Sequence, residues 1–116
     1  MTKDSLIGVR DPFGIRPLVL GKYKNSYVLS SESCGLDIIG ADLVRDIEPG
    51  ELVIIKKNRI ESFKPFKTTQ LRPCLFEYIY FSRPDSILQG RNVYEVRKKI
   101  GEELATENSG DKNKIC

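Results

Sequence analysis

The stretch Leu6–Gly21 reads LIGVRDPFGIRPLVLG and sets the pattern for the first half of the chain. Two apolar runs, LIGV and PLVL, stand on either side of DPFG, where Pro12 fixes φ for a turn and Gly14 can adopt a positive φ. Apolar runs of this length, bounded by turn residues, predict short β-strands. Because three apolar residues follow one another in Leu18–Leu20, we expect the second strand to be buried on both faces, as in a sheet covered by another layer.

The pattern of short strands and turns continues to about residue 63. Residues 6–31 predict a β-meander, and Ser31–Ala41 predicts one or two helical turns with Ser31 or Ser33 as N-cap. A second hairpin is expected from strands at Glu51–Lys56 and Arg59–Phe63, joined by a turn at Lys57 and Asn58.

The second half of the chain changes character. Lys64–Pro73 carries two prolines among polar residues and is the predicted linker. Beyond it, apolar residues at three- and four-residue spacing predict a helix over residues 92–107, with Asn92 and Glu95 resembling a capping box. Lys98 and Glu102 add an i,i+4 charge pair to that helix.

Composition excludes several classes of function. The 116 residues suffice for one domain, and the 19 Lys and Arg are interspersed with 16 Asp and Glu, which does not favour a nucleic-acid partner. No apolar run has the length of a signal peptide or membrane helix, so we expect a cytoplasmic protein without a membrane partner. The chain has no histidine, which excludes Ser-His-Asp and Cys-His catalysis within it. Cys34, Cys74 and Cys116 are far apart and are predicted to be reduced thiols.

Four motifs together resemble the amidophosphoribosyltransferase family. They are RDPFGIRPLVLG, SSESCGLDIIGA, RDIEPGELVII and, at Cys74–Ser86, CLFEYIYFSRPDS. The resemblance implies an α+β fold: part of an N-terminal-nucleophile hydrolase αββα sandwich that runs into the first helix of an α/β phosphoribosyltransferase domain. Residues 1–73 would be the C-terminal part of the glutaminase domain. Residues 74–116 would be the interdomain segment and the start of the transferase domain.

The resemblance also implies an activity for the parent protein. Such enzymes release ammonia from glutamine and use it to displace pyrophosphate from phosphoribosylpyrophosphate, giving 5-phosphoribosylamine for purine synthesis. They use an N-terminal Cys as nucleophile, and their phosphate-binding loop follows the region matched here, so we expect an internal piece with no catalytic residue and no activity alone. The implied parent uses glutamine, phosphoribosylpyrophosphate and Mg²⁺, and is a homo-oligomer.

The last motif contains the candidate site residues. Tyr80 matches a tyrosine beside the ammonia route of the family, whereas the residues alone predict that Tyr78 and Tyr80 alternate with Phe76 and Ile79 across a half-buried strand. Arg83 and Asp85 lie at the same interdomain position and are expected to form a local ion pair. Asp85 or Ser86 is a candidate helix cap.

Four further side chains have open roles. Cys74 matches a position that ligates a [4Fe-4S] cluster in one branch of the family and is a cysteine without a cluster in another, and one thiolate cannot hold a cluster. Arg16 would be costly to bury unpaired, and Asp11 is its expected partner. Asp11 and Glu32 imitate a catalytic carboxylate pair, but no base-tuning partner accompanies them.

Two alternatives remain open at this point. DPFGIRPL also resembles the glutaminase domain of asparagine synthetase, although the element RPDS at Arg83–Ser86 counts against it. The chain could otherwise be a stand-alone β-rich binding module without catalysis.

Overall fold

The computed structural model describes residues 1–57, 59–66 and 71–108, and divides them into two sheets, a strand pair and three helical elements. The first sheet has the order β1-β5-β6, the second has the order β3-β2-β4, and β7 pairs with β8. All strand pairs are antiparallel. In chain order the elements are β1 Leu6–Val9, β2 Val19–Tyr23, β3 Ser26–Ser30, α1 Ser33–Ile39, β4 Asp42–Asp46, β5 Leu52–Lys56, β6 Arg59–Phe63, η1 Glu77–Phe81, β7 Ile87–Leu88, β8 Arg91–Asn92 and α2 Val93–Glu107.

The strand pairings predicted for the first half of the chain have different outcomes. The hairpins β2-β3 and β5-β6 are confirmed. The meander over residues 6–31 is wrong at its first strand, because β1 pairs with β5 in the other sheet, with Ile7 opposite Ile54. The loop Arg10–Leu18 carries the chain from one sheet to the other, so neighbours in sequence are not neighbours in a sheet. β4 was not predicted, since DLVRD has charged residues at both ends and only two apolar residues between them.

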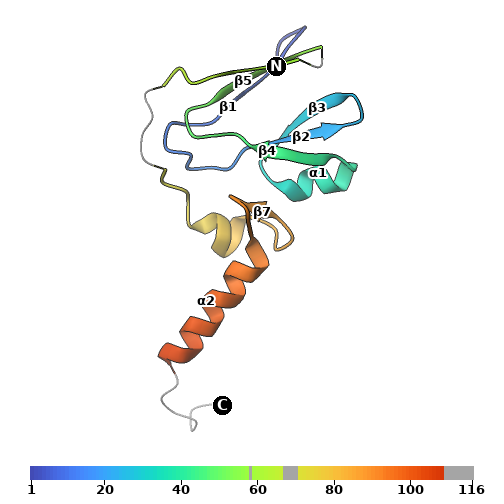
Figure 1. Cartoon of the computed structure of the whole chain (residues 1–116). Helices are drawn as coiled ribbons and strands as arrows, with labels where there is room; N and C mark the ends of the chain where they lie inside the picture. Colours follow the sequence, from blue (N-terminus) through green and yellow to red (C-terminus); the bar gives the residue numbers. More distant parts are fainter. Residues whose placement is uncertain (58, 67–70, 109–116) are drawn as a thin grey trace.

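The core lies on both sides of the second sheet, as the sequence predicted for β2. On one side Leu20 packs between the sheets with Ile47, Val53 and Ile55. On the other side Val19 packs with Leu36 and Ala41 beneath α1. Consecutive residues of a strand point to opposite faces, so Val19 and Leu20 join three layers: α1, then β3-β2-β4, then β1-β5-β6. Figure 1 shows these layers stacked in that order.

The two α-helices begin differently. The predicted N-caps of α1 are wrong, because its N-cap residue is Glu32, which makes no side-chain capping bond. Gly40 ends α1 in the left-handed conformation, with φ of 68°. The predicted cap of α2 is confirmed, since Asn92 Oδ1 accepts a 3.2 Å hydrogen bond from the Glu95 amide.

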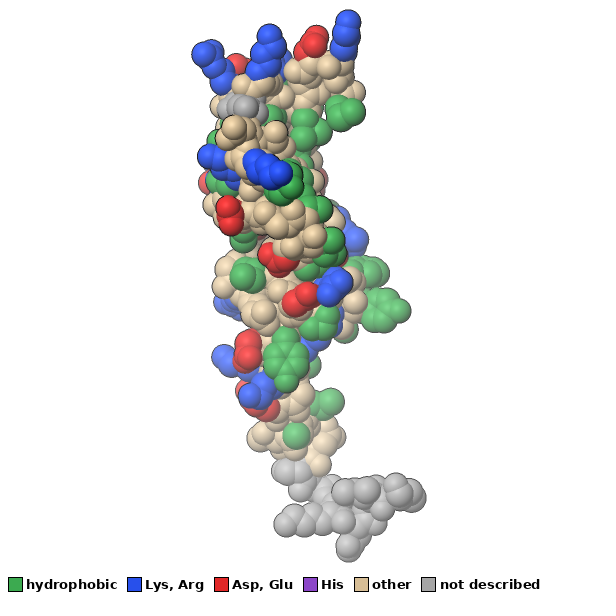
Figure 2. All heavy atoms as spheres, turned by 90° about the vertical axis from the view of Figure 1, so that its right-hand side faces the viewer, with side chains coloured by type: hydrophobic (Ala, Val, Ile, Leu, Met, Phe, Trp, Pro, Cys, Tyr) green, Lys and Arg blue, Asp and Glu red, His purple; other side chains and the backbone are tan. Residues whose placement is uncertain are grey.

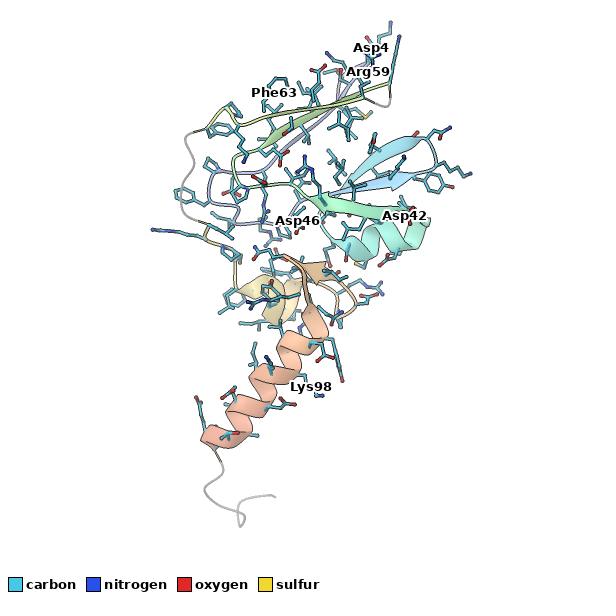
Figure 3. The ribbon with its side chains drawn as sticks, in the orientation of Figure 1. Asp4, Asp42, Asp46, Arg59, Phe63 and Lys98 are labelled. Atoms are coloured by element: carbon cyan, nitrogen blue, oxygen red, sulfur yellow. The ribbon has the colours of Figure 1, made fainter. Side chains whose placement is uncertain are left out.

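α2 extends away from the layers, and the molecule is elongated. Every described residue from Lys98 onward is exposed, and Lys98 Nζ lies 4.0 Å from Glu102 Oε1. Figures 1 and 3 show this helix leaving the body, with Lys98 on it. The principal extents are 65 × 34 × 19 Å, and Figure 2 shows hydrophobic and charged side chains interspersed along the narrow face. No helix in the described ranges is long and apolar enough to cross a membrane.

Candidate functional site

The predicted site residues lie together at the junction between the sheet layers and α2. Tyr80 belongs to η1, Arg83 and Asp85 belong to the loop that follows it, and Cys74 precedes it. In Figure 1 this segment lies between α1 and the start of α2. The chain approaches it beside the first turn, since the Arg72 amide donates to Phe13 O at 2.8 Å and the Cys74 amide donates to Ile15 O at 2.9 Å.

η1 is a π-helix, and the strand expected over these residues is wrong. The Ser82 amide donates to Glu77 O at 3.1 Å, an i to i+5 bond. The expected alternation therefore does not occur: Glu77 is buried and Tyr78 half-buried, whereas Ile79, Tyr80 and Phe81 are all exposed. π-helical turns are rare and are often found at functional sites.

The widened turn leaves the Tyr78 carbonyl without its α-helical partner, the Ser82 amide. Arg97 of α2 takes that place: its Nε donates to Tyr78 O at 2.6 Å and its Nη2 donates to Ser82 O at 2.8 Å. The Tyr78 hydroxyl donates to Leu88 O at 3.0 Å, and burial raises the pKa of Tyr78. One arginine therefore fixes η1 to α2.

Tyr80 is the most exposed side chain of η1, with 79% of its surface accessible. Its ring meets the edge of Phe81 at 6.0 Å, and Phe81 is 6.1 Å from Phe76. The Arg16 guanidinium stands over the Phe81 ring at 4.7 Å. Tyr80 is thus part of an exposed aromatic surface that it forms with Phe76 and Phe81.

The expected partner of Arg16 is wrong. Its Nε lies 2.9 Å from Glu77 Oε1, although the N–H is not aligned for a hydrogen bond, and Ser82 Oγ donates to Glu77 Oε2 at 2.8 Å. Asp11 instead accepts bonds from the amides of Phe13 and Ile15, each at 2.9 Å, and so closes its own turn. The ion pair of Arg16 therefore joins the loop between the sheets to η1.

The buried arginine of this region is Arg10, which sequence reasoning did not single out. Its guanidinium donates to the carbonyls of Arg16, Ile47 and Gly14, at 3.0, 2.6 and 3.1 Å. Burial lowers the pKa of Arg10 and raises that of Asp46, while their opposite charges act against both shifts. Figure 3 shows Asp46 at one end of β4 and Asp42 at the other. Arg10 holds the loop between the sheets in shape.

Glu32 and Ser33, at the start of α1, bind the loop after η1. Glu32 Oε2 accepts the Arg83 amide at 2.8 Å and the Ser86 hydroxyl at 2.9 Å. Ser33 Oγ accepts the Ile87 amide at 2.7 Å. Ser86 is therefore not a helix cap by its side chain, and Glu32 and Asp11 serve separate networks rather than one carboxylate pair.

The expected Arg83–Asp85 ion pair is confirmed. Nε and Nη2 of Arg83 donate to the two carboxylate oxygens of Asp85, at 3.1 and 3.0 Å. The hydrogen bond from Arg83 lowers the pKa of Asp85, and the same bond raises the pKa of Arg83. Both side chains are exposed. Neither Asp85 nor Ser86 caps α2, whose first amides use backbone carbonyls: Val93 N donates to Ser86 O and Tyr94 N to Pro84 O, both at 3.0 Å.

An open pocket of about 210 Å³ lies at the same junction. Its walls come from the sheet layers through Arg16, Pro17, Ser31 and Glu32, and from η1 through Glu77 and Phe81. Cys74 lies outside it and is half-buried. Among the described residues, no three His, Cys, Asp or Glu side chains are grouped to hold a metal ion.

Sequence reasoning missed Glu77, Arg97 and the binding role of Glu32. Arg97 could have been found, because it lies four residues after the buried Val93 and therefore on the inward face of α2. Glu32 and Glu77 carried no such signal, since Ser86 lies 54 residues after Glu32 and Arg16 lies far before Glu77 in the chain.

The chain is similar to known proteins over almost its whole length. No family model matches the chain. An amidophosphoribosyltransferase of Synechococcus elongatus is 53% identical over 114 residues, which are 95% of this chain and 23% of the relative. One of Rhizobium etli is 49% identical over 116 residues, covering 96% of this chain. The resemblance to amidophosphoribosyltransferases is confirmed.

Solved structures agree with the amidophosphoribosyltransferase match. A B. subtilis glutamine phosphoribosylpyrophosphate amidotransferase complexed with ADP and GMP has a TM-score of 0.91 and 41% identity over 96% of this chain. A structure described as the allosteric regulatory enzyme of purine biosynthesis has a TM-score of 0.89 and 43% identity. The mixed α and β fold expected here is therefore that of an amidophosphoribosyltransferase segment, and the chain spans about a quarter of those structures.

Proposed function

We propose that this chain is an internal segment of a cytoplasmic amidophosphoribosyltransferase, a glycosyltransferase with glutamine amidotransferase activity that acts at the start of purine synthesis. The observation that carries the proposal is the joint agreement of sequence and backbone, 53% identity and a TM-score of 0.91, over both sheet layers and α2. The two described cysteines, Cys34 and Cys74, are free thiols, which suits a reducing compartment.

The proposed parent reaction has two balanced halves. Water cleaves the side-chain amide of glutamine to give glutamate and ammonia. The ammonia nitrogen then forms a bond to C1 of phosphoribosylpyrophosphate as the C1–O bond to pyrophosphate breaks, and the nitrogen loses a proton. Both reaction centres belong to parts of the parent outside this segment. The segment itself joins the half that makes ammonia to the half that consumes it.

The finer domain division belongs to this proposal. Residues 1–73 would complete the glutaminase domain, and α1 with the two sheets would supply three of the four layers of an αββα sandwich. Residues 74–116 would lead into the phosphoribosyltransferase domain, whose first helix would be α2. Before η1 the chain forms packed sheet layers, whereas α2 is packed only at its start. This change favours a domain boundary near η1.

Tyr80 would form part of the wall of the ammonia route. Support comes from its exposed position on the aromatic surface of η1, beside the pocket between the layers and η1. An aromatic ring can line an apolar passage while its hydroxyl bonds elsewhere. Arg83 and Asp85 would shape the neighbouring loop through their ion pair.

Cofactors and partners of the parent remain proposals. Mg²⁺ would accompany phosphoribosylpyrophosphate, and Cys74 could give one of the four thiolates of a [4Fe-4S] cluster, which the described residues do not complete. We propose glutamine and phosphoribosylpyrophosphate as substrates and a homo-oligomeric parent.

The test is a chimera in which residues 1–107 replace the matching segment of the Synechococcus elongatus relative. The chimera should form phosphoribosylamine with glutamine as nitrogen donor and also with added ammonium, which bypasses the glutaminase half. Activity with ammonium but none with glutamine would contradict the proposed joining role. A folded chimera without either activity would contradict the proposal as a whole and favour a stand-alone binding module.

A further inference from the structure

We infer that Glu32 is a positioning residue that fixes the loop after η1, and through it α2, to the sheet layers. Glu32 is not one of the candidate site residues Cys74, Tyr80, Arg83 and Asp85. It starts from the position of Glu32, which directly precedes α1 and lies 51 residues before Arg83 in the chain. No local feature of the sequence brings these two residues together, so their contact is made by the fold.

Two neighbouring side chains receive three donors from one loop. Glu32 accepts the Arg83 amide and the Ser86 hydroxyl through the same oxygen, and Ser33 accepts the Ile87 amide. Ser33 is 4% exposed and Ser86 is fully buried, so water cannot readily replace the acceptors of the Ile87 amide and the Ser86 hydroxyl, whereas the bond from the Arg83 amide is exposed. A buried donor that loses its acceptor is costly, and the loop is therefore held in one place.

The attachment continues into α2 through the backbone. The carbonyls of Pro84 and Ser86 accept the amides of Tyr94 and Val93, which are among the first amides of the helix. The same loop thus has Glu32 on one side and α2 on the other. A shift of the loop away from Glu32 would carry α2 and, through Arg97, η1 with it.

The charge at this attachment comes from Glu32 alone. Arg83 contributes only its backbone amide, because its guanidinium is paired with Asp85. A carboxylate that accepts two donors binds them more strongly than a neutral oxygen would. Glutamine at this position keeps the length and one acceptor but loses the charge, whereas alanine loses both.

A consequence for the parent follows, and it rests on the proposed function. If Glu32 sets the place of η1 relative to the glutaminase layers, its loss should let ammonia escape before it reaches phosphoribosylpyrophosphate. The ratio of glutamate released to phosphoribosylamine formed should then rise. A role limited to stability would lower both products together and leave that ratio unchanged.

The first measurement is amide hydrogen exchange on the 116-residue chain, which does not depend on any activity. In E32A the Arg83 amide should exchange about tenfold faster or more, with E32Q between E32A and the unaltered chain. D37A is the matched control, since Asp37 is an exposed acid of α1, the helix that Glu32 precedes. Equal exchange at Arg83 in all four proteins would overturn the inference.

The second measurement places E32A, E32Q and D37A in the chimera. The glutamate to phosphoribosylamine ratio should rise in the order D37A, E32Q, E32A, while ammonium-dependent synthesis stays within about twofold of the unaltered chimera. An unchanged ratio in an active E32A chimera would contradict the positioning role. If the unaltered chimera forms no product from either donor, the proposed function fails, and the exchange measurement still decides whether Glu32 holds the loop.

Discussion

At the scale of single residues, the most heavily bonded side chain of the sheet layers is Glu51. Its carboxylate accepts two hydrogen bonds from Arg45, at 2.6 and 2.9 Å, one from Ser62 Oγ and one from the Glu48 amide. Arg45 belongs to β4 and Ser62 to β6, so Glu51 ties the second sheet to the first. The bonds from Arg45 are the main cause that lowers the pKa of Glu51 from 4.5 to about 2.

The first prediction concerns E51Q and pH. A carboxylate with a lowered pKa stabilises the fold above pH 4.5, and this contribution is lost as pH falls from there towards 2. E51Q should therefore lower the free energy of unfolding by about 2 kcal/mol at pH 7 and by much less near pH 2. Urea unfolding at both pH values measures this loss of stability. E61Q is the control, because Glu61 is an exposed acid. An equal loss at both pH values would contradict it.

The second prediction concerns Tyr80 in the chimera. Y80A removes the ring from the aromatic surface, so glutamine-dependent synthesis should fall severalfold more than ammonium-dependent synthesis. Y80F keeps the ring and should stay close to the unaltered enzyme. Parallel assays with the two nitrogen donors measure the difference, and equal losses in Y80A would argue against a place on the ammonia route.

At the scale of elements, η1 shows why an aromatic run does not define a strand. Tyr, Phe and Ile are typical strand residues, and EYIYF alternates well enough to suggest one. A strand there would need a partner for its backbone, and the segment instead satisfies its own amides through a π-turn and its free carbonyl through Arg97. Arg97, which stabilises this conformation, lies nineteen residues after Tyr78 in the chain.

The third prediction follows from that contact. R97A removes both donors from the end of η1, so the amide of Ser82 should exchange faster and local stability should fall by about 1–3 kcal/mol. R97K keeps the charge but offers no planar pair of donors, and should recover only part of the loss. K98A is the control, because Lys98 directly follows Arg97 in α2 and its side chain is exposed. Protection of Ser82 that is the same in R97A and K98A would show that η1 does not depend on Arg97.

At the scale of the whole molecule, apolar side chains are exposed just before η1, on η1 and along α2. They are Leu75, Phe76, Ile79, Tyr80, Phe81, Tyr94, Ile100 and Leu104. The radius of gyration is 18.2 Å, compared with about 13 Å for a compact domain of about 100 residues. Exposed apolar surface of this extent marks an interaction surface.

The fourth prediction is that the isolated chain self-associates as its concentration rises. Replacing Leu75 and Phe76 together by serine should weaken the association, because both side chains are more than half exposed and belong to this surface. Sedimentation velocity across a concentration series measures it. A chain that stays monomeric and unfolds cooperatively would contradict the prediction.

The sequence predicted those parts of the fold that local patterns control. α2 was predicted with its cap because Asn92, Glu95 and the apolar spacing are all local. Burial of β2 on both faces was predicted from three apolar residues in succession. Partners of β1, Arg16 and Glu32 were not predictable, because each is chosen by contacts between distant segments. The four motifs located the site by resemblance, and the residues that bind its loop carried no pattern of their own.

The attachment of α2 at one end makes it a lever arm. Its 15 residues extend about 22 Å, so a tilt of about 10° at its base would move its far end by about 4 Å. The loop at Ser86 is the fulcrum of that movement, and Glu32 holds it. A small displacement at the start of α1 is thus amplified along α2 into one that can make or break side-chain contacts at the other end of the helix.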